Sequence, residues 1–507
     1  MKPLQSEPEK AERDIERLSR EVERLRQELT ERDRKLVEAE RQISEAEKQI
    51  ADLERKLALR LQNSVTSSKP PSSDGLAGEQ RPRGRKKGKS RRKPGGQPGH
   101  RGHWRGLAPA DRVDHVVDLL PDRCRHCECS FAGKRRKVST QGEPRRHQVT
   151  ELPPIEAQIT EYRCQSAVCP DCGKTTQAEL PQEVQGHFGP ELTALIAYLT
   201  VVCRLPRRVV QELLGQVLGI PLSLGSIQNS WEEASQAVAE PCTQLEQQLA
   251  HEPVINSDET GYRTSGEKRW LWALVAPAFV FYKIALTRGA EVLVQLLGEV
   301  FAGILCSDRC PTYLKYHKGE GQFCWAHFKR NILGVLEIAK TTEAERFCRD
   351  ALALHARLFR LWHRFRAGPG VRYGPITREQ LIAKSIPLEK KFFALAERYV
   401  DSRDKDVRNL ALALMKHFEK FFAFLRNEGV EPTNNSAERA LRCAVQWRKI
   451  SFGSRSTQGE IAVARLLTVT RTCRIQNREP LDYLGSAIRS HRQAQAVPSL
   501  LKTAPTA

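Results

Sequence analysis

The 507-residue sequence predicts a multidomain α/β protein. Three observations lead to this prediction: a heptad repeat near the amino terminus, two Cys-x-x-Cys pairs in the second hundred residues, and strand and helix patterns in the second half. A chain of this length exceeds what one hydrophobic core usually organises. We therefore expect several modules that follow one another along the chain.

Residues 1–62 are predicted to form a coiled coil. An apolar residue recurs at every seventh position over seven heptads, and five heptads repeat a second apolar position three residues later. The unbroken position contains Ile15, Val22, Leu29, Leu36, Ile43, Ile50 and Leu57. A solvated single helix has no need for such a position, so we expect a homo-oligomer formed through this helix. Arg32 and Arg60 interrupt the second position and leave the number of helices open.

Residues 63–106 are predicted to form a disordered basic linker. The segment begins with a run rich in Ser, Pro and Gly that cannot support a packed core. Between Arg81 and Arg105 there are eleven Lys or Arg residues and no Asp or Glu. The whole chain carries a formal charge of +21, which favours nucleic acid as a partner. We expect this stretch to bind the DNA backbone, with a merely solvated segment as the alternative.

Residues 107–186 are predicted to form a small zinc-binding module. Two Cys-x-x-Cys pairs can offer Zn²⁺ the four thiolates of a closed structural site. The candidate ligands are Cys124, Cys127, Cys169 and Cys172. Cys129 and Cys164 are spare candidates, so the ligand register stays open.

The composition argues against a secreted or membrane protein. The fourteen cysteines are scattered irregularly, which favours reduced thiols over a disulfide framework. No apolar run approaches the roughly 20 residues of a membrane span, and the first residues lack the apolar stretch of a signal peptide. We therefore expect a soluble, intracellular protein.

Residues 187–250 are predicted to form a helical DNA-binding module. The stretches 207–218 and 224–234 have helical patterns and are joined by a short turn, as in a helix-turn-helix. Ser223 is expected to cap the second helix. A plain helical hairpin fits the same pattern.

Residues 251–335 are predicted to form the first part of a catalytic core. An apolar strand ends at Asp258, and a second apolar strand ends at Asp308. Two further strands, at 268–275 and 280–286, and a helix at 290–300 lie between them. Three antiparallel strands, a helix and a fourth strand are the order of a ribonuclease H-like core, in which acids at the ends of the first and fourth strands lie side by side.

The core is predicted to resume after a long interruption. Residues 336–424 have helical periodicity and are expected to form an all-helical insertion. Residues 425–490 form the second part of the core, in which Glu438 lies in the first turn of a capped helix. Residues 491–507 are expected to be a disordered tail.

Asp258, Asp308 and Glu438 are the candidate catalytic residues, as ligands of two divalent ions. Oxygen ligands suit Mg²⁺ or Mn²⁺. In two-metal enzymes one ion activates the attacking oxygen and the other stabilises the leaving oxygen. Each acid alone also fits a turn or helix-terminal role, and only their joint order favours a site. Glu259 and Glu431 are neighbouring alternatives.

Cys324 and His327 form a further pair of soft-metal ligands just before the insertion. A zinc site would need two more ligands, and the sequence does not indicate them. We expect this pair to serve packing or an auxiliary role in the active site.

These motifs together resemble the transposases of insertion-sequence family 66. The matching segments are NSVTSSKPPSSD, GGQPGHRGH, the paired Cys-x-x-Cys module, SDETGYR, SDRCPTY, CWAH and TNNSAERALR. The resemblance covers nearly the whole chain. It implies a DDE-type transposase whose catalytic triad is Asp258, Asp308 and Glu438, and it implies that Cys324 and His327 match the Cys-x-x-His signature after the second aspartate.

The resemblance also implies partners, an activity, and a cytoplasmic location at the bacterial nucleoid. The protein would bind double-stranded DNA at the element ends and at the target, cleave the 3′ ends and transfer the strands, with small accessory proteins of the same element. The main alternative is a non-catalytic DNA-binding regulator derived from a transposase. A host nuclease with the same core is a third hypothesis, but it would not need so many DNA-binding modules.

Overall fold

A computed structural model describes most of the chain in two compact units. The described residues are 7–62, 106–131, 139, 141–181, 183–184, 186–367 and 374–501. The smaller unit comprises Gln80–Glu161 and Leu213–Pro221, and the larger unit comprises the rest. Nearly all of the predicted linker, including the whole basic stretch of residues 81–105, lies outside the described residues.

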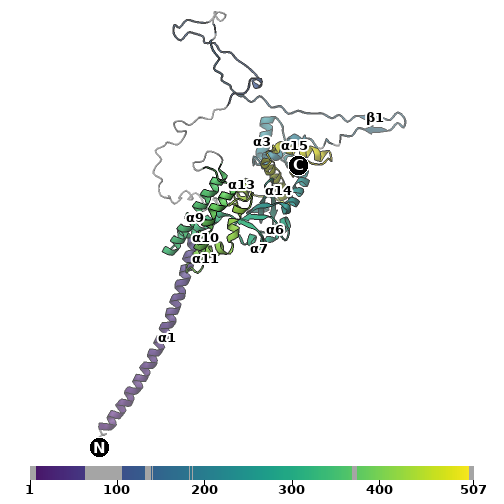
Figure 1. Ribbon diagram of the computed structural model, residues 1–507. Helices are drawn as coiled ribbons and strands as arrows, with labels where there is room; N and C mark the ends of the chain where they lie inside the picture. The colour runs from purple at the N-terminus through teal and green to yellow at the C-terminus, as the bar shows by residue number, and fades with distance from the viewer. Residues whose placement is uncertain are drawn as a thin grey trace. The chain divides into compact units, whose positions relative to one another are not determined.

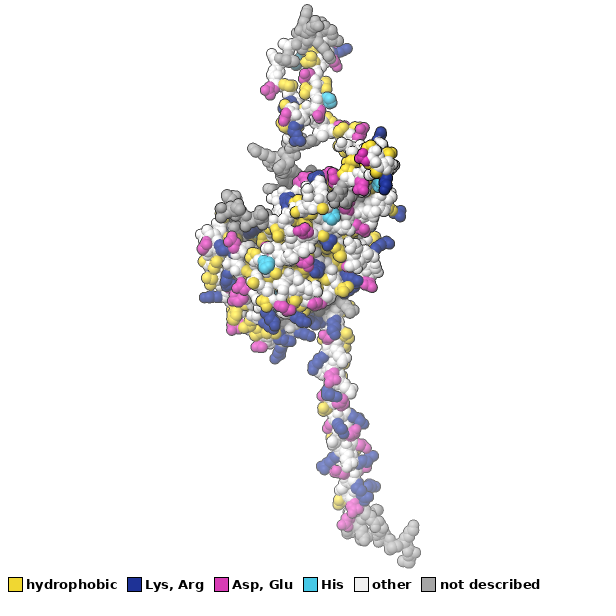
Figure 2. All heavy atoms as spheres, turned by 90° about the vertical axis from the view of Figure 1, so that its right-hand side faces the viewer, with side chains coloured by type: hydrophobic (Ala, Val, Ile, Leu, Met, Phe, Trp, Pro, Cys, Tyr) yellow, Lys and Arg dark blue, Asp and Glu magenta, His cyan; other side chains and the backbone are white. Residues whose placement is uncertain are grey.

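Helix α1 (Glu7–Leu61) is one continuous helix of 55 residues, as the heptad pattern predicts. Basic and acidic side chains follow one another along its length (Figure 2), and pairs such as Arg24 and Glu21 lie 2.8 Å apart. The apolar heptad positions are exposed in the single chain, for example Ile15 at 64%. A partner helix would cover this stripe, and the coiled coil itself stays a prediction.

The predicted helical module consists of four α-helices and a 3₁₀ turn. They are α2 (Pro190–Val201), α3 (Arg207–Leu218), α4 (Leu224–Ala237), α5 (Ala239–Gln248) and η5 (Leu249–His251). The hydroxyl of Ser223 accepts a hydrogen bond from the backbone N–H of Ser226 at 3.0 Å and caps α4, as predicted. DNA contact by this module stays a prediction.

A five-stranded mixed sheet forms the centre of the larger unit (Figure 1). Its strands are β3 (Val254–Thr264), β4 (Glu267–Val275), β5 (Val280–Ala285), β6 (Ile304–Ser307) and β7 (Gly321–Phe323). Their order is β5-β4-β3-β6-β7. Strands β3, β4 and β5 are antiparallel neighbours, whereas β6 runs parallel to both β3 and β7. With α6 (Ala290–Leu297) between β5 and β6, the predicted order of elements is found.

Strand β3 is longer than the sequence indicates. It does not end at Asp258, because it continues into a tight hairpin with β4. Ser265 and Gly266 form the two-residue loop, and both have positive φ angles, 49° and 83°, as tight hairpins require. What ends near Asp258 is the pairing with β6, whose last partners are Asn256 and Cys306.

The residues of β3 alternate between the two faces of the sheet. Val254 belongs to a hydrophobic cluster built with the helices that follow β7, whereas Ile255 belongs to a second cluster built with most of the remaining helices. This alternation decides which side of the sheet each polar side chain of β3 can reach.

The helical insertion begins earlier than predicted. Its helices are α8 (Trp325–Ile338), α9 (Thr342–Arg366), α10 (Arg378–Tyr399), α11 (Lys405–Lys416) and α12 (Phe418–Arg426). The expected start at residue 336 therefore falls inside α8. Trp325 explains the earlier start, because its fully buried ring lies 5.0 Å from Phe392 and 5.1 Å from Phe421, in the centre of the insertion.

Three helices complete the larger unit. They are α13 (Asn435–Ser451), α14 (Thr457–Ile475) and α15 (Pro480–Arg492). The hydroxyls of Thr468 and Thr472 accept hydrogen bonds from backbone N–H groups of the edge strand β5, which protects that edge. No described helix is long and apolar enough to cross a membrane.

The prediction of a disordered tail from residue 491 is wrong for residues 491–501. Helix α15 continues to Arg492, and Leu500 is only 1% exposed. The hydroxyl of Tyr483 donates to the carbonyl of Pro498 at 2.6 Å, and Gln476 donates to the carbonyl of Leu500 at 2.7 Å. The sequence pattern missed this segment because it packs without regular secondary structure. Residues 502–507 lie outside the described residues.

Candidate active site

Asp258 lies in strand β3, and Asp308 follows the last residue of the neighbouring parallel strand β6. Strand β3 pairs with β6 at a constant offset of fifty residues, from Val254 with Ile304 to Asn256 with Cys306. Continued by two residues, the same offset would place Asp258 beside Asp308, which lies just past the end of β6. Both aspartates are half-buried, and both follow the alternation of Val254 and Ile304, which point to the same face. The sequence prediction that the two acids meet is consistent with this register.

Backbone N–H groups orient both aspartates. Asp258 accepts a hydrogen bond from the N–H of Glu259 at 2.9 Å. Asp308 accepts one from the N–H of Cys310 at 2.8 Å, immediately before α7 (Pro311–Tyr316) begins. Each aspartate therefore keeps carboxylate lone pairs for other partners.

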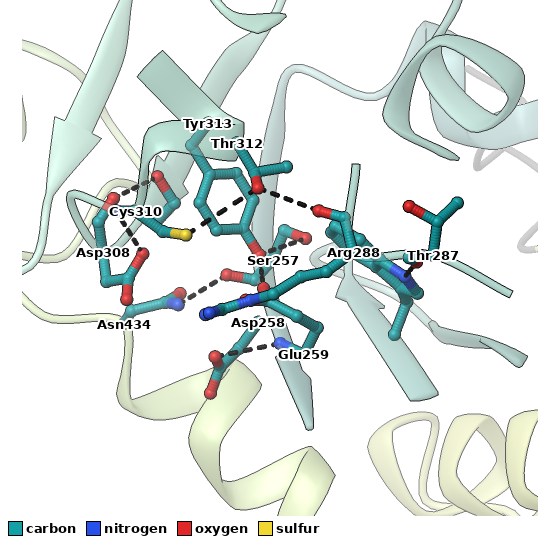
Figure 3. Close-up of polar contacts among 12 residues, drawn as sticks. Ser257, Asp258, Glu259, Thr287, Arg288, Asp308, Cys310, Thr312, Tyr313 and Asn434 are labelled. Atoms are coloured by element: carbon teal, nitrogen blue, oxygen red, sulfur yellow. Dashed lines mark hydrogen bonds and ion pairs between the residues drawn. The ribbon is translucent and has the colours of Figure 1, made fainter. Parts of the chain in front are cut away.

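Glu438 enters the site from α13, in the first turn of that helix. Asn434 is the residue before the helix, but its side chain does not cap it. The amide instead donates to the carbonyl of Ser257 at 2.7 Å (Figure 3) and accepts from Asn256 at 3.0 Å. Asn434 thereby fastens the start of α13 to strand β3, beside Asp258. The sequence indicated a cap at this position but not this anchoring role.

The negative charges of the acids affect the ionisation of Asp258. Burial raises the pKa of Asp258 well above its usual range, and the charges of Glu259, Asp308 and Glu438 raise it further. Among the described residues, however, these three acids do not form a group of ligand atoms that all lie within 4.8 Å of one another. The site therefore concentrates negative charge, but the three carboxylates do not all lie within reach of one common ion in this conformation.

Glu259, the neighbouring alternative, faces the other side of the sheet and is already paired. Its carboxylate accepts a hydrogen bond from Arg288 at 2.6 Å and another from the hydroxyl of Tyr313 (Figure 3). Tyr313 in turn lies 3.3 Å from the hydroxyl of Ser257. The other alternative, Glu431, forms an ion pair with Arg366 at 3.4 Å. Each of these two alternative acids is thus already paired with an arginine side chain of the protein.

A second cluster adjoins the acids. Cys324, His327 and Glu438 each offer a ligand atom, and these atoms lie within 4.8 Å of one another. Cys324 precedes α8, and its sulfur accepts a hydrogen bond from the backbone N–H of Asn434 at 3.2 Å. The sequence did not reveal Glu438 as a neighbour of this pair, because more than a hundred residues separate the two motifs and no local pattern links them.

The two predicted zinc pairs lie in tight turns, one in each unit. Cys169 follows β1 (Ser166–Val168) in a hairpin with β2 (Thr175–Gln177), and Cys124 begins a turn closed by its N–H bond to the carbonyl of Cys129. Hydrogen bonds from the backbone of the following residues lower the pKa of Cys124 and of Cys169. Such turns favour the thiolate form that binds metal. The shared four-thiolate site stays a prediction.

Comparison with known sequences identifies the family. The sequence model of the transposase IS66 family matches residues 185–462, more than half of the chain. The chain belongs to this family. The matched range runs from the helical module to α14 and includes Asp258, Asp308 and Glu438. The resemblance that the sequence motifs indicated is therefore confirmed. Residues 1–106 match a second model, described as a family of unknown function (DUF6444).

Two relatives from Sinorhizobium fredii (strain NBRC 101917 / NGR234) are similar to this transposase-family chain. Uncharacterized protein y4qI is 27% identical over 273 residues, which cover 48% of this chain and 48% of that protein. Uncharacterized protein y4hP is 24% identical over 409 residues, which cover 74% of this chain and 71% of that protein. The chain thus spans about half the length of the first relative and most of the second.

Proposed function

We propose that this chain is a DDE-type DNA transposase that uses Asp258, Asp308 and Glu438 to cleave the 3′ ends of an insertion sequence and to transfer them into target DNA. The single observation that most supports the proposal is the parallel pairing of β3 with β6, which ends two residues before Asp258 and Asp308. The order of the sheet, three antiparallel strands followed by two parallel ones, supports a ribonuclease H-like core.

The acids fit the divalent cations that this chemistry needs. Half-buried carboxylates that repel one another and keep free lone pairs suit Mg²⁺ or Mn²⁺, which prefer oxygen ligands. Asp258, Asp308 and Glu438 would hold these ions. When bound, the ions supply charge that activates the attacking oxygen and stabilises the leaving oxygen of an in-line phosphoryl transfer.

The chain's own residues contribute position and charge. The pairing of β3 with β6 brings the two aspartates near each other, and Asn434 fastens the start of α13, which carries Glu438, to β3. Arg288 pairs with Glu259 on the other face of the sheet, so that the carboxylate of this acid already has a partner within the protein.

The modules before the core would bind DNA. The proposal assigns backbone contact to the basic stretch of residues 81–105, structural Zn²⁺ to the four cysteines, and element-end contact to α3 and α4. The exposed apolar stripe of α1 would join copies of the chain. Accessory proteins of the same element would be further partners.

The test uses full-length protein, DNA that carries the terminal repeats of its own element, and Mg²⁺. We expect nicking at the 3′ ends and joining to target DNA. Asp258→Asn, Asp308→Asn and Glu438→Gln should each lower both reactions on the order of a thousandfold, because each removes a charged ligand. Glu431→Gln is the matched control and should retain activity. Unchanged activity in the three variants would refute the assignment, and binding without cleavage by the unaltered chain would favour a DNA-binding regulator.

A further inference from the structure

Three side chains of different chemistry converge beside the carboxylates. Cys324 precedes α8, His327 lies in the first turn of α8, and Glu438 lies in the first turn of α13. In the part of the chain that the structure describes, this is the one group of three or more potential metal ligands within 4.8 Å of one another. Glu438 therefore belongs to two sets of neighbours, the aspartates of the sheet and the Cys–His pair of the insertion.

Two buried atoms in this group lack a hydrogen-bond partner. The Nδ1 atom of His327 and the Oε1 atom of Glu438 are both inaccessible to solvent and form no hydrogen bond within the described residues, and they lie 3.5 Å apart. That distance is too long for a good N–H···O hydrogen bond. It is close to the roughly 3.4 Å that separates two ligands of one tetrahedral Zn²⁺, each about 2.0–2.1 Å from the ion. A cation between them would satisfy both atoms.

The ligand types select the kind of cation. A thiolate and an imidazole suit Zn²⁺ and similar thiophilic ions, whereas Mg²⁺ prefers oxygen ligands in an octahedron. Burial raises the pKa of Cys324 to about 11, so binding must displace the thiol proton, which passes to solvent as the metal–sulfur bond forms. The N–H of Asn434, which already donates to this sulfur, would stabilise the thiolate.

We propose that Cys324, His327 and Glu438 bind a thiophilic divalent cation such as Zn²⁺, and that Zn²⁺ bound there takes Glu438 from the magnesium-dependent site and inhibits the enzyme. The inhibition rests on the proposed function, whereas the binding does not. Three protein ligands leave a fourth position of a tetrahedral ion open to water.

The binding test measures the zinc content of full-length protein after dialysis against buffered Zn²⁺. Cys324→Ser and His327→Ala should each bind one equivalent less than the unaltered chain. The second variant guards against misfolding, because His327 is less buried than Cys324. Cys348→Ala, which alters a buried cysteine of α9, is the control and should bind as much as the unaltered chain. The four predicted zinc cysteines are present in every variant, so any zinc that they bind is the same in all of the proteins and does not affect the difference in zinc content. Equal zinc content in all four proteins would overturn the proposal.

The inhibition test measures DNA cleavage in Mg²⁺ with increasing Zn²⁺, each protein relative to its own rate without Zn²⁺. Half-inhibition of Cys324→Ser should need at least about tenfold more Zn²⁺ than half-inhibition of the unaltered chain or Cys348→Ala. Equal sensitivity, or activation by Zn²⁺, would overturn the inhibitory role. If no protein cleaves DNA even without Zn²⁺, the proposed function fails, and the zinc content still decides the metal site.

Discussion

Asp258 and Glu259 are neighbours in strand β3, but their carboxylates meet opposite surroundings. Glu259 faces Arg288 and Tyr313, which supply a positive charge and a hydroxyl donor. Burial raises the pKa of Asp258, and the charges of Glu259, Asp308 and Glu438 raise it further. Burial raises the pKa of Glu259 as well, so burial alone does not distinguish the two acids. A carboxylate that the protein has paired stabilises the fold, whereas one left among like charges is suited to bind a cation from outside.

The largest expected effect comes from neutralising the unpaired acid. Asp258→Asn should lower DNA cleavage on the order of a thousandfold, because it removes a metal ligand. It should not lower the free energy of unfolding in metal-free buffer, because it also removes a repelled buried charge. Cleavage assays and urea denaturation of the same preparation check both halves. If Asp258→Asn unfolds more easily and keeps its activity, the contrast between Asp258 and Glu259 is refuted.

Neutralising the paired acid, Glu259, should lower the stability of the fold and leave DNA cleavage nearly unchanged. Glu259→Gln should lower the free energy of unfolding by about 1–3 kcal/mol, since it weakens buried hydrogen bonds to Arg288 and Tyr313. Cleavage per folded molecule should stay within a few-fold of the unaltered chain. Urea denaturation and cleavage at a temperature where both proteins are folded are the measurements. A loss of activity as large as that of Asp258→Asn would show that Glu259 also takes part in the chemistry.

The anchor of α13 should produce a smaller, mixed effect. Asn434→Ala removes the amide that joins α13 to β3, so we expect about 1–2 kcal/mol lower unfolding free energy and roughly tenfold slower cleavage. Asn435→Ala, at the next position, is the matched control and should change both quantities less. Equal effects of the two substitutions would argue against the anchoring role.

The smallest expected effect concerns pH. Because the pKa of Asp258 is raised in the folded chain, its contribution to stability is fully present below the usual pKa of an aspartate and is lost as the pH rises through the raised value. In metal-free buffer the melting temperature of Asp258→Asn should therefore exceed that of the unaltered chain by a growing margin from acid to neutral pH. Mg²⁺ should reduce this margin by stabilising only the unaltered chain. A difference in melting temperature that does not change with pH would contradict the raised pKa of Asp258.

Local sequence patterns predicted the elements well, and contacts between distant segments account for what they missed. The strand and helix order of the core and the cap at Ser223 follow from apolar periodicity and short-range hydrogen bonding. Periodicity could not tell that β3 continues past Asp258, because that depends on its pairing with β4. The insertion was placed too late because Trp325 reads as part of a metal motif until its aromatic neighbours are known.

The candidate site shows the same division between what local sequence patterns reveal and what depends on contacts between distant segments. Two aspartates after apolar runs could be recognised in the sequence, and the parallel pairing of β3 with β6 then brings them near each other. The link between Cys324, His327 and Glu438 could not be recognised, because it exists only where α8 and α13 begin side by side in space. The bonds from Asn434 to β3 were likewise invisible, since an asparagine before a helix is ordinarily a cap.

The most direct test of the central claim is the position of Mn²⁺ in crystals of the full-length protein, located by anomalous scattering. We predict Mn²⁺ bound by the carboxylate oxygens of Asp258 and Asp308, with Glu438 at or beside the same ions, and no Mn²⁺ at Glu259. Mn²⁺ bound elsewhere, with Asp258 and Asp308 left without a metal at saturating concentration, would contradict the account.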